Sequence, residues 1–126
     1  MSQYVEYGPD QYMDPCGSSL MGYVTATYGD LVGLFGEPNC PPGDKTWNSW
    51  DISFTVFEDD EGEDHQDIYA SIYDWKEMGP EVSRNAGQHV WHIGGFHGRE
   101  HPAHWLVTDL VQDVSLTDFY TFERKQ

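Results

Sequence analysis

The fold of this chain is best predicted from the stretch Gln88-His89-Val90-Trp91-His92-Ile93-Gly94-Gly95-Phe96-His97. Large side chains alternate along it, which is typical of a β-strand over about Gln88–Gly95. The Gly94-Gly95 pair either ends this strand or brings another backbone close to it. Further on, Pro102 suits the first position of a helix. Apolar residues at helical spacing then predict a helix over about Pro102–Asp113: Ala103, Leu106, Val107, Leu110, Val111 and Val114.

Two more strands are predicted upstream of this stretch. Apolar residues from Trp50 to Val56 alternate with polar ones, so this segment has the period of a strand. The segment Ile68–Trp75 carries bulky side chains on both faces, as a central strand does: Ile68, Ala70 and Ile72 on one, Tyr69, Tyr73 and Trp75 on the other. The acid-rich run Glu58–Asp67 between the two strands predicts a solvated hairpin tip.

A short helix is predicted over Tyr28–Phe35, after a β-prone run from Gly22 to Tyr28. Thr27 is placed to cap its N-terminus, and Asp30 completes a capping box with Asp in place of Glu. The helix ends at Gly36, which suits a left-handed C-terminal cap.

These elements predict an α+β fold, because strands grouped between helices are typical of that class. We expect an antiparallel sheet of three to four strands with two helices packed on one face, in the order strand-helix-strand-strand-strand-helix. Residues 21–126 are expected to form one domain, since the chain has 126 residues. Residues 1–20 predict an ordered, tyrosine-rich N-terminal arm that covers part of the other face. The segment Thr117–Gln126 is expected to be extended or an edge strand.

The charge of the chain is strongly acidic. Its 22 Asp and Glu residues against six Lys and Arg give a formal net charge of −16. This field repels a nucleic-acid backbone, so we expect no direct DNA or RNA binding. Three interpretations stay open: solubility, a high-salt environment, or imitation of nucleic acid in the basic groove of another protein.

The location is expected to be cytoplasmic. Cys16 and Cys40 are too few for a disulfide framework, so free thiols are the expectation, although one bridge between them is left open. No secretory signal begins the chain, and no run approaches about 18 apolar residues, so no membrane association is expected.

Several motifs between Gly22 and Val114 together resemble a family of small bacteriophage and prophage proteins that has no established activity. The motifs are Ala26-Thr27-Tyr28, Phe35-Gly36-Glu37-Pro38, Trp50-Asp51-Ile52-Ser53-Phe54, Ala70-Ser71-Ile72-Tyr73-Asp74-Trp75-Lys76 and Trp91-His92-Ile93-Gly94-Gly95. The resemblance implies a small phage accessory product that acts in the host cytoplasm. The acid run, the tyrosine-rich arm and the histidines after Gly95 depart from the family pattern.

The histidines raise the question of a metal site. His89 and His92 point to opposite faces of a strand and cannot share one ion. Zinc held by His97, His101 and His104 is conceivable, with an open position that would activate water for hydrolysis. The sequence lacks a His-Glu-x-x-His motif and a cysteine pair, so the preferred prediction is no cofactor.

A small-ligand site is a second hypothesis. The turn from Gly94 to Arg99, which leads into a helix, offers backbone N–H groups and a guanidinium to an anion such as a nucleotide; the alternative is a plain turn. The candidate ligand-binding residues are Tyr73, Trp75, Trp91, Gly94, Gly95, His97 and Arg99.

The acid run carries the leading hypothesis for function. We predict a non-enzymatic phage accessory protein that binds and inhibits or sequesters a host protein with a basic surface, of a nucleic-acid-binding or anti-phage defence type. No catalytic residue is predicted, and self-association is left open. The predicted partner-binding residues are Glu58, Asp59, Asp60, Glu61, Glu63, Asp64 and Asp67.

Overall fold

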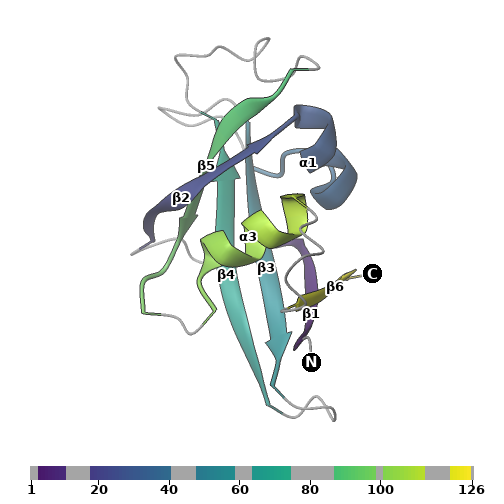
Figure 1. The fold of residues 1–126 in the computed structure, drawn as a ribbon, viewed down its shortest axis with the longest axis vertical. Coiled ribbons are helices and arrows are strands. Elements are labelled where there is room, and N and C mark those ends of the chain that lie inside the picture. The colour runs from purple at the N-terminus through teal and green to yellow at the C-terminus, as the bar shows by residue number, and fades with distance from the viewer. Residues whose placement is uncertain are drawn as a thin grey trace.

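The computed structural model describes residues 3–10, 18–40, 48–58, 64–74, 87–98, 101–112 and 120–125. Within them the chain forms a six-stranded sheet with helices packed on it (Figure 1). The elements in chain order are β1 (Gln3–Pro9), β2 (Ser19–Ala26), α1 (Tyr28–Phe35), β3 (Ser49–Phe57), β4 (His65–Tyr73), β5 (His89–Gly95), α3 (Ala103–Gln112) and β6 (Tyr120–Arg124).

The sheet is mixed, with strand order β2-β5-β4-β3-β1-β6. Its strand pairs are antiparallel except for β1 and β6, which run parallel at one edge. The α+β class is therefore confirmed, but the prediction of a purely antiparallel sheet of three to four strands was wrong. The sheet is larger and mixed partly because Gln3–Pro9, from the predicted N-terminal arm, does not lie over the sheet. This segment is a strand inserted between β3 and β6, and it runs parallel to β6.

The core lies between one face of the sheet and both helices, as predicted. Figure 1 shows α1 and α3 on the same side of the strands. The alternating positions of β3 that point to this side are fully buried, and Leu31, Phe35, Leu106 and Val107 cover them from the helices. The remaining large core side chains come from the other strands: Val5, Tyr7, Val24, Ile68, Ile72, Trp91 and Ile93.

The capping box of α1 is confirmed. The Thr27 side chain accepts a hydrogen bond from the backbone N–H of Asp30 at 2.9 Å, and the Asp30 carboxylate accepts one from the N–H of Thr27 at 3.2 Å. Gly36 ends the helix at φ 84°, a conformation that glycine adopts without strain.

Gly94 and Gly95 end β5 and allow close packing on both faces of the sheet. A Cβ on Gly95 would lie 2.7 Å from the Cβ of Ala103, at the start of α3. A Cβ on Gly94 would clash with Oγ of Ser71 on the other face. Gly95 thus lets α3 approach β5 closely.

Candidate protein-binding face

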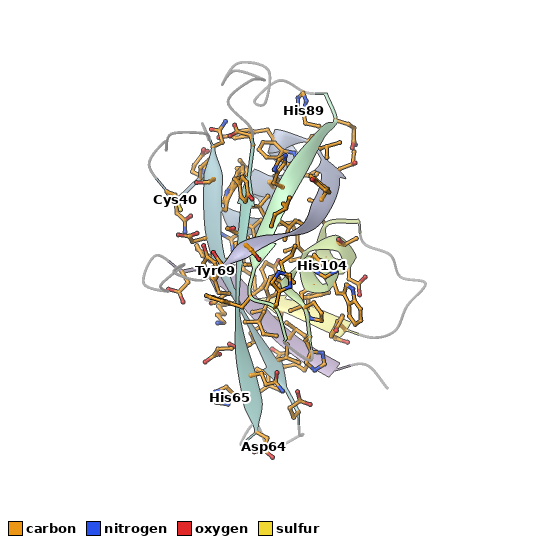
Figure 2. The ribbon with its side chains drawn as sticks, turned by 90° about the vertical axis from the view of Figure 1, so that its left-hand side faces the viewer. Cys40, Asp64, His65, Tyr69, His89 and His104 are labelled. Atoms are coloured by element: carbon orange, nitrogen blue, oxygen red, sulfur yellow. The ribbon has the colours of Figure 1, made fainter. Side chains whose placement is uncertain are left out.

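The candidate site lies on the sheet face turned away from α1 and α3, called the open face below. Figure 2 shows His104 near the helices, with Tyr69 and His65 on the opposite side of the strands. Neither of the helices just described packs on this face. Its side chains alternate with the core positions along the strands, and those nearest the β3–β4 hairpin are Tyr4, Glu6, Thr55, Phe57, His65, Asp67 and Glu123.

An aromatic row crosses the open face at the hairpin end. The ring centroids of Tyr4 and Phe57 lie 5.5 Å apart, and those of Phe57 and His65 lie 6.0 Å apart. His65 is exposed, and Tyr4 keeps 36% of its surface in solvent. The row therefore offers ring surface to a partner.

A carboxylate row runs beside the aromatic row. Glu6 pairs with Glu123 on β6 and with Thr55 on β3, and Thr55 pairs with Asp67 on β4. The Thr55 hydroxyl donates to the Asp67 carboxylate at 2.8 Å. Three acidic side chains thus share one line across four strands.

Tyr4 joins the two rows. Its hydroxyl donates to the Glu123 carboxylate at 2.5 Å and lies 3.5 Å from the Glu6 carboxylate. The hydrogen bond to Glu123, with further contributions from burial and the negative charges, raises the pKa of Tyr4 to about 12. Among the described residues, strand alternation places one basic side chain on this face, that of Lys125. Its ammonium group donates to the Ser53 hydroxyl at 3.1 Å.

The predicted acidic hairpin extends from the same end of the sheet. β3 and β4 pair antiparallel, and the N–H of Glu58 donates to the carbonyl of Asp64 at 2.8 Å. Figure 2 places Asp64 at the far end of this ribbon. Of the seven predicted residues, Asp67 lies in the carboxylate row, whereas the Glu58 carboxylate contacts His101 at 3.2 Å. Asp59, Asp60, Glu61 and Glu63 lie outside the described residues.

The centre of the open face is closed by local contacts. Tyr69 is buried, and its hydroxyl donates to the Asp51 carboxylate at 2.7 Å. The Asn39 side chain accepts a hydrogen bond from the backbone N–H of Asp51 at 2.7 Å and donates one to the carbonyl of Asp51 at 2.9 Å. Burial, followed by the neighbouring Asp51, raises the pKa of the Cys40 thiol to about 11. The middle of the open face is therefore less accessible to a partner than its hairpin end.

The predicted ligand residues do not form one site. Trp91 is buried in the core against Trp50, and Gly95 faces α3. Tyr73 and Gly94 lie on the open face, where the ring centroids of Tyr73 and His92 are 5.2 Å apart. The sheet separates the two pairs because neighbouring strand residues point to opposite faces. His97 is exposed, and Trp75 and Arg99 lie outside the described residues.

Two histidines of the predicted zinc site, His101 and His104, have different neighbours. His101 hydrogen-bonds the Tyr120 hydroxyl at 3.1 Å through Nδ1 and the Glu58 carboxylate through Nε2. His104 packs on Gly22, and its Nδ1 is buried without a hydrogen-bond partner in the described part of the chain. Burial, and then repulsion from His97, lowers the pKa of His104. Over the described ranges, no three His, Cys, Asp or Glu side chains could hold one metal ion.

The sequence did not indicate most of the candidate face. Glu6 and Glu123 are brought together by pairing between the two chain termini, which no local pattern reveals. The alternation in Tyr4-Val5-Glu6-Tyr7 is the signal that could have identified β1.

Comparison of the chain with protein-family models, curated proteins and solved structures gave no match. The resemblance to phage proteins therefore stays a prediction. Among the described residues, no helix has the length and apolar character to cross a membrane.

Proposed function

We propose that this chain is a protein-binding module that engages a basic surface of a partner through the hairpin end of its open face. The supporting observation is the carboxylate row of Glu6, Asp67 and Glu123 beside the aromatic row. Like charges on neighbouring strands repel one another. A cationic partner relieves this repulsion, so the arrangement favours association with Lys and Arg side chains.

The aromatic row supplies the anchors of this interaction. A Lys or Arg side chain over Tyr4 or Phe57 gains a cation–π contact of about 0.5–1 kcal/mol at an exposed site. Tyrosine is also enriched among the residues that dominate binding energy. The net charge of −16 extends the attraction beyond direct contact and speeds the encounter.

The proposed partner is a host protein whose basic surface normally meets nucleic acid, of a nucleic-acid-binding or anti-phage defence type. The resemblance to phage proteins suggests this setting. Occupying such a surface inhibits or sequesters the partner by competition with nucleic acid. The proposal requires no catalytic residue in this chain.

The test is affinity capture from a bacterial lysate with a matched pair of charge reversals. Glu123→Lys changes the carboxylate row, and Glu37→Lys is its control. Both glutamates are exposed, and each accepts a hydrogen bond from a tyrosine hydroxyl, from Tyr4 and Tyr28 respectively. The two variants therefore have equal net charge and lose equivalent contacts.

We expect the wild-type chain and Glu37→Lys to retain a basic protein, and Glu123→Lys to lose it. Capture should weaken as the screening length falls from about 10 Å at about 0.1 M salt to about 3 Å at about 1 M. Capture that is the same for both variants, or that is indifferent to salt, would refute the proposal. Competition of the captured protein with duplex DNA then tests the inhibitory role.

A further inference from the structure

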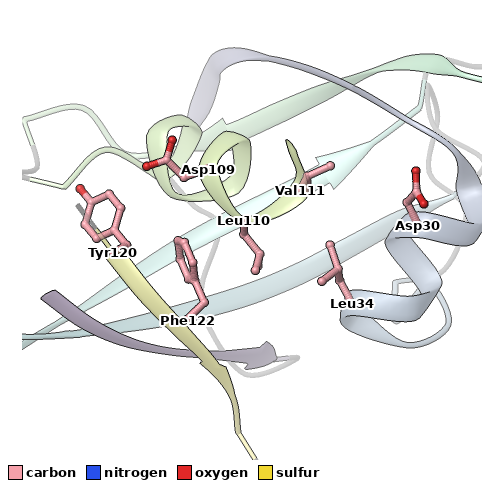
Figure 3. A pocket seen from close by; sticks show the side chains of 7 residues that line it. All are labelled: Asp30, Leu34, Asp109, Leu110, Val111, Tyr120 and Phe122. Carbon is pink, nitrogen blue, oxygen red and sulfur yellow. The ribbon is translucent and has the colours of Figure 1, made fainter. Parts of the chain in front are cut away.

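A cleft of about 510 Å³ lies between α1, α3 and β6, on the helix side of the sheet (Figure 3). This volume is within the range of about 300–1,000 Å³ that is usual for small-molecule sites. The cleft and the carboxylate row lie on opposite faces of the sheet, because the neighbouring residues Phe122 and Glu123 of β6 point to opposite sides. Four of the seven described lining residues are apolar: Leu34, Leu110, Val111 and Phe122.

The charged groups of the cleft are both acidic and lie apart. Figure 3 shows Asp109 at the end near Tyr120 and Asp30 at the end near Leu34, with the apolar side chains between them. The described lining residues include no Lys, Arg or His. Asp109 is partly buried, and this burial raises its pKa. The cleft therefore has apolar side chains at its centre and one carboxylate at each end.

We propose that this cleft binds an aliphatic diamine or polyamine. The methylene chain lies over Leu34, Leu110 and Phe122, while the two terminal ammonium groups pair with Asp30 and Asp109. Burial of the methylene groups is favourable because it removes apolar surface from water, and an ammonium offsets the desolvation of a partly buried carboxylate. Asp30 can accept such a group because its capping contact uses one oxygen, Oδ2.

The alternative is loose association of any polycation with an acidic chain. It differs from the proposal in two measurable ways. A defined cleft selects one spacing between the ammonium groups, whereas a diffuse field does not. A defined cleft also depends on its own carboxylates more than on equally acidic residues elsewhere.

The experiment is isothermal titration calorimetry at about 0.15 M salt with a series of diamines from putrescine to octamethylenediamine, and with hexylamine as the single-charge control. We expect one saturable site, an optimum at one chain length, and binding of hexylamine that is weaker by about tenfold, the equivalent of one lost charged hydrogen bond. Absence of binding, or affinity independent of chain length, would overturn the proposal.

Matched variants locate the site. Asp109→Asn is expected to weaken the best diamine by about tenfold, whereas Glu37→Gln, which removes the same charge outside the described lining of the cleft, leaves affinity within about twofold. Leu110→Ala should flatten the dependence on chain length, and thermal melts confirm that each variant is folded. Equal losses in Asp109→Asn and Glu37→Gln would show diffuse association instead. The diamine titrations do not involve Glu123, whose substitution tests the protein-binding proposal. The two proposals can therefore fail separately.

Discussion

Trp50 and Trp91 meet edge to face in the core, with ring centroids 5.5 Å apart and ring planes at 76°. The indole N–H of Trp50 donates to the carbonyl of Gly36 at 2.9 Å, and that of Trp91 donates to the carbonyl of Ala26 at 2.9 Å. Ala26 precedes the N-terminal cap of α1, and Gly36 is its C-terminal cap. Two tryptophans from β3 and β5 therefore hold both ends of one short helix against the sheet.

Trp91→Phe is expected to lower the free energy of unfolding by about 1–3 kcal/mol, because the carbonyl of Ala26 loses a buried donor and the smaller ring leaves a void. Urea denaturation measures this change. Trp105→Phe is the control, since Trp105 keeps 55% of its surface exposed and should change stability by less than about 0.5 kcal/mol. Equal effects of the two substitutions would contradict the role assigned to Trp91.

Local patterns predicted the elements whose causes are local. Thr27 and Asp30 indicated the start of α1 because a capping box needs only residues three apart. The alternation from Trp50 to Val56 predicted β3 for the same reason. The parallel pairing of β1 with β6 joins residues 3–7 to residues 120–124, and no local period specifies such a partner. The sheet was therefore predicted too small.

The candidate sites were less predictable than the fold. Trp91 and Tyr73 were grouped as ligand residues by their shared aromatic character, but strand alternation places them on opposite faces. Glu123 was not singled out, because its role follows from its register with Glu6 across the chain termini. His89 and His92 were correctly separated, since that inference needed only the geometry of one strand.

Two glycine substitutions should change stability in opposite directions. Gly33 lies within α1, and no neighbouring atom of the described residues comes within 4 Å of the position of a Cβ. Gly33→Ala should therefore stabilise the fold by about 0.5–1 kcal/mol through higher helix propensity. Gly95→Ala should destabilise it by about 1–3 kcal/mol, because the new methyl group would meet Ala103 and displace α3. Urea denaturation of both variants measures the two changes. A neutral Gly95→Ala would show that α3 does not depend on this close approach.

The thiol of Cys40 should react slowly at neutral pH. Burial and the nearby Asp51 raise its pKa to about 11, and the thiolate is the reactive form. In a Cys16→Ser background, iodoacetamide should therefore modify Cys40 roughly a hundredfold more slowly at pH near 8 than a free cysteine of pKa about 8.5. Mass spectrometry of timed samples gives the rate, which should keep rising up to about pH 11. A rate that levels off below pH 9 would contradict the raised pKa.

His104 should make the fold less stable as the solution is acidified. Burial of its ring, and then repulsion from His97, holds its pKa below the ordinary value in the folded state, whereas the unfolded chain titrates near about 6.5. Between these two values the unfolded state binds more protons, so stability falls as pH decreases through about 6.5 toward the folded pKa. Proton NMR titration of the imidazole should give a midpoint below that of free histidine, and His97→Gln should raise this midpoint by removing the repulsion. His104 packs on Gly22, and its Nδ1 is buried without a hydrogen-bond partner among the described residues. A titration midpoint at or above the ordinary value would contradict this buried setting.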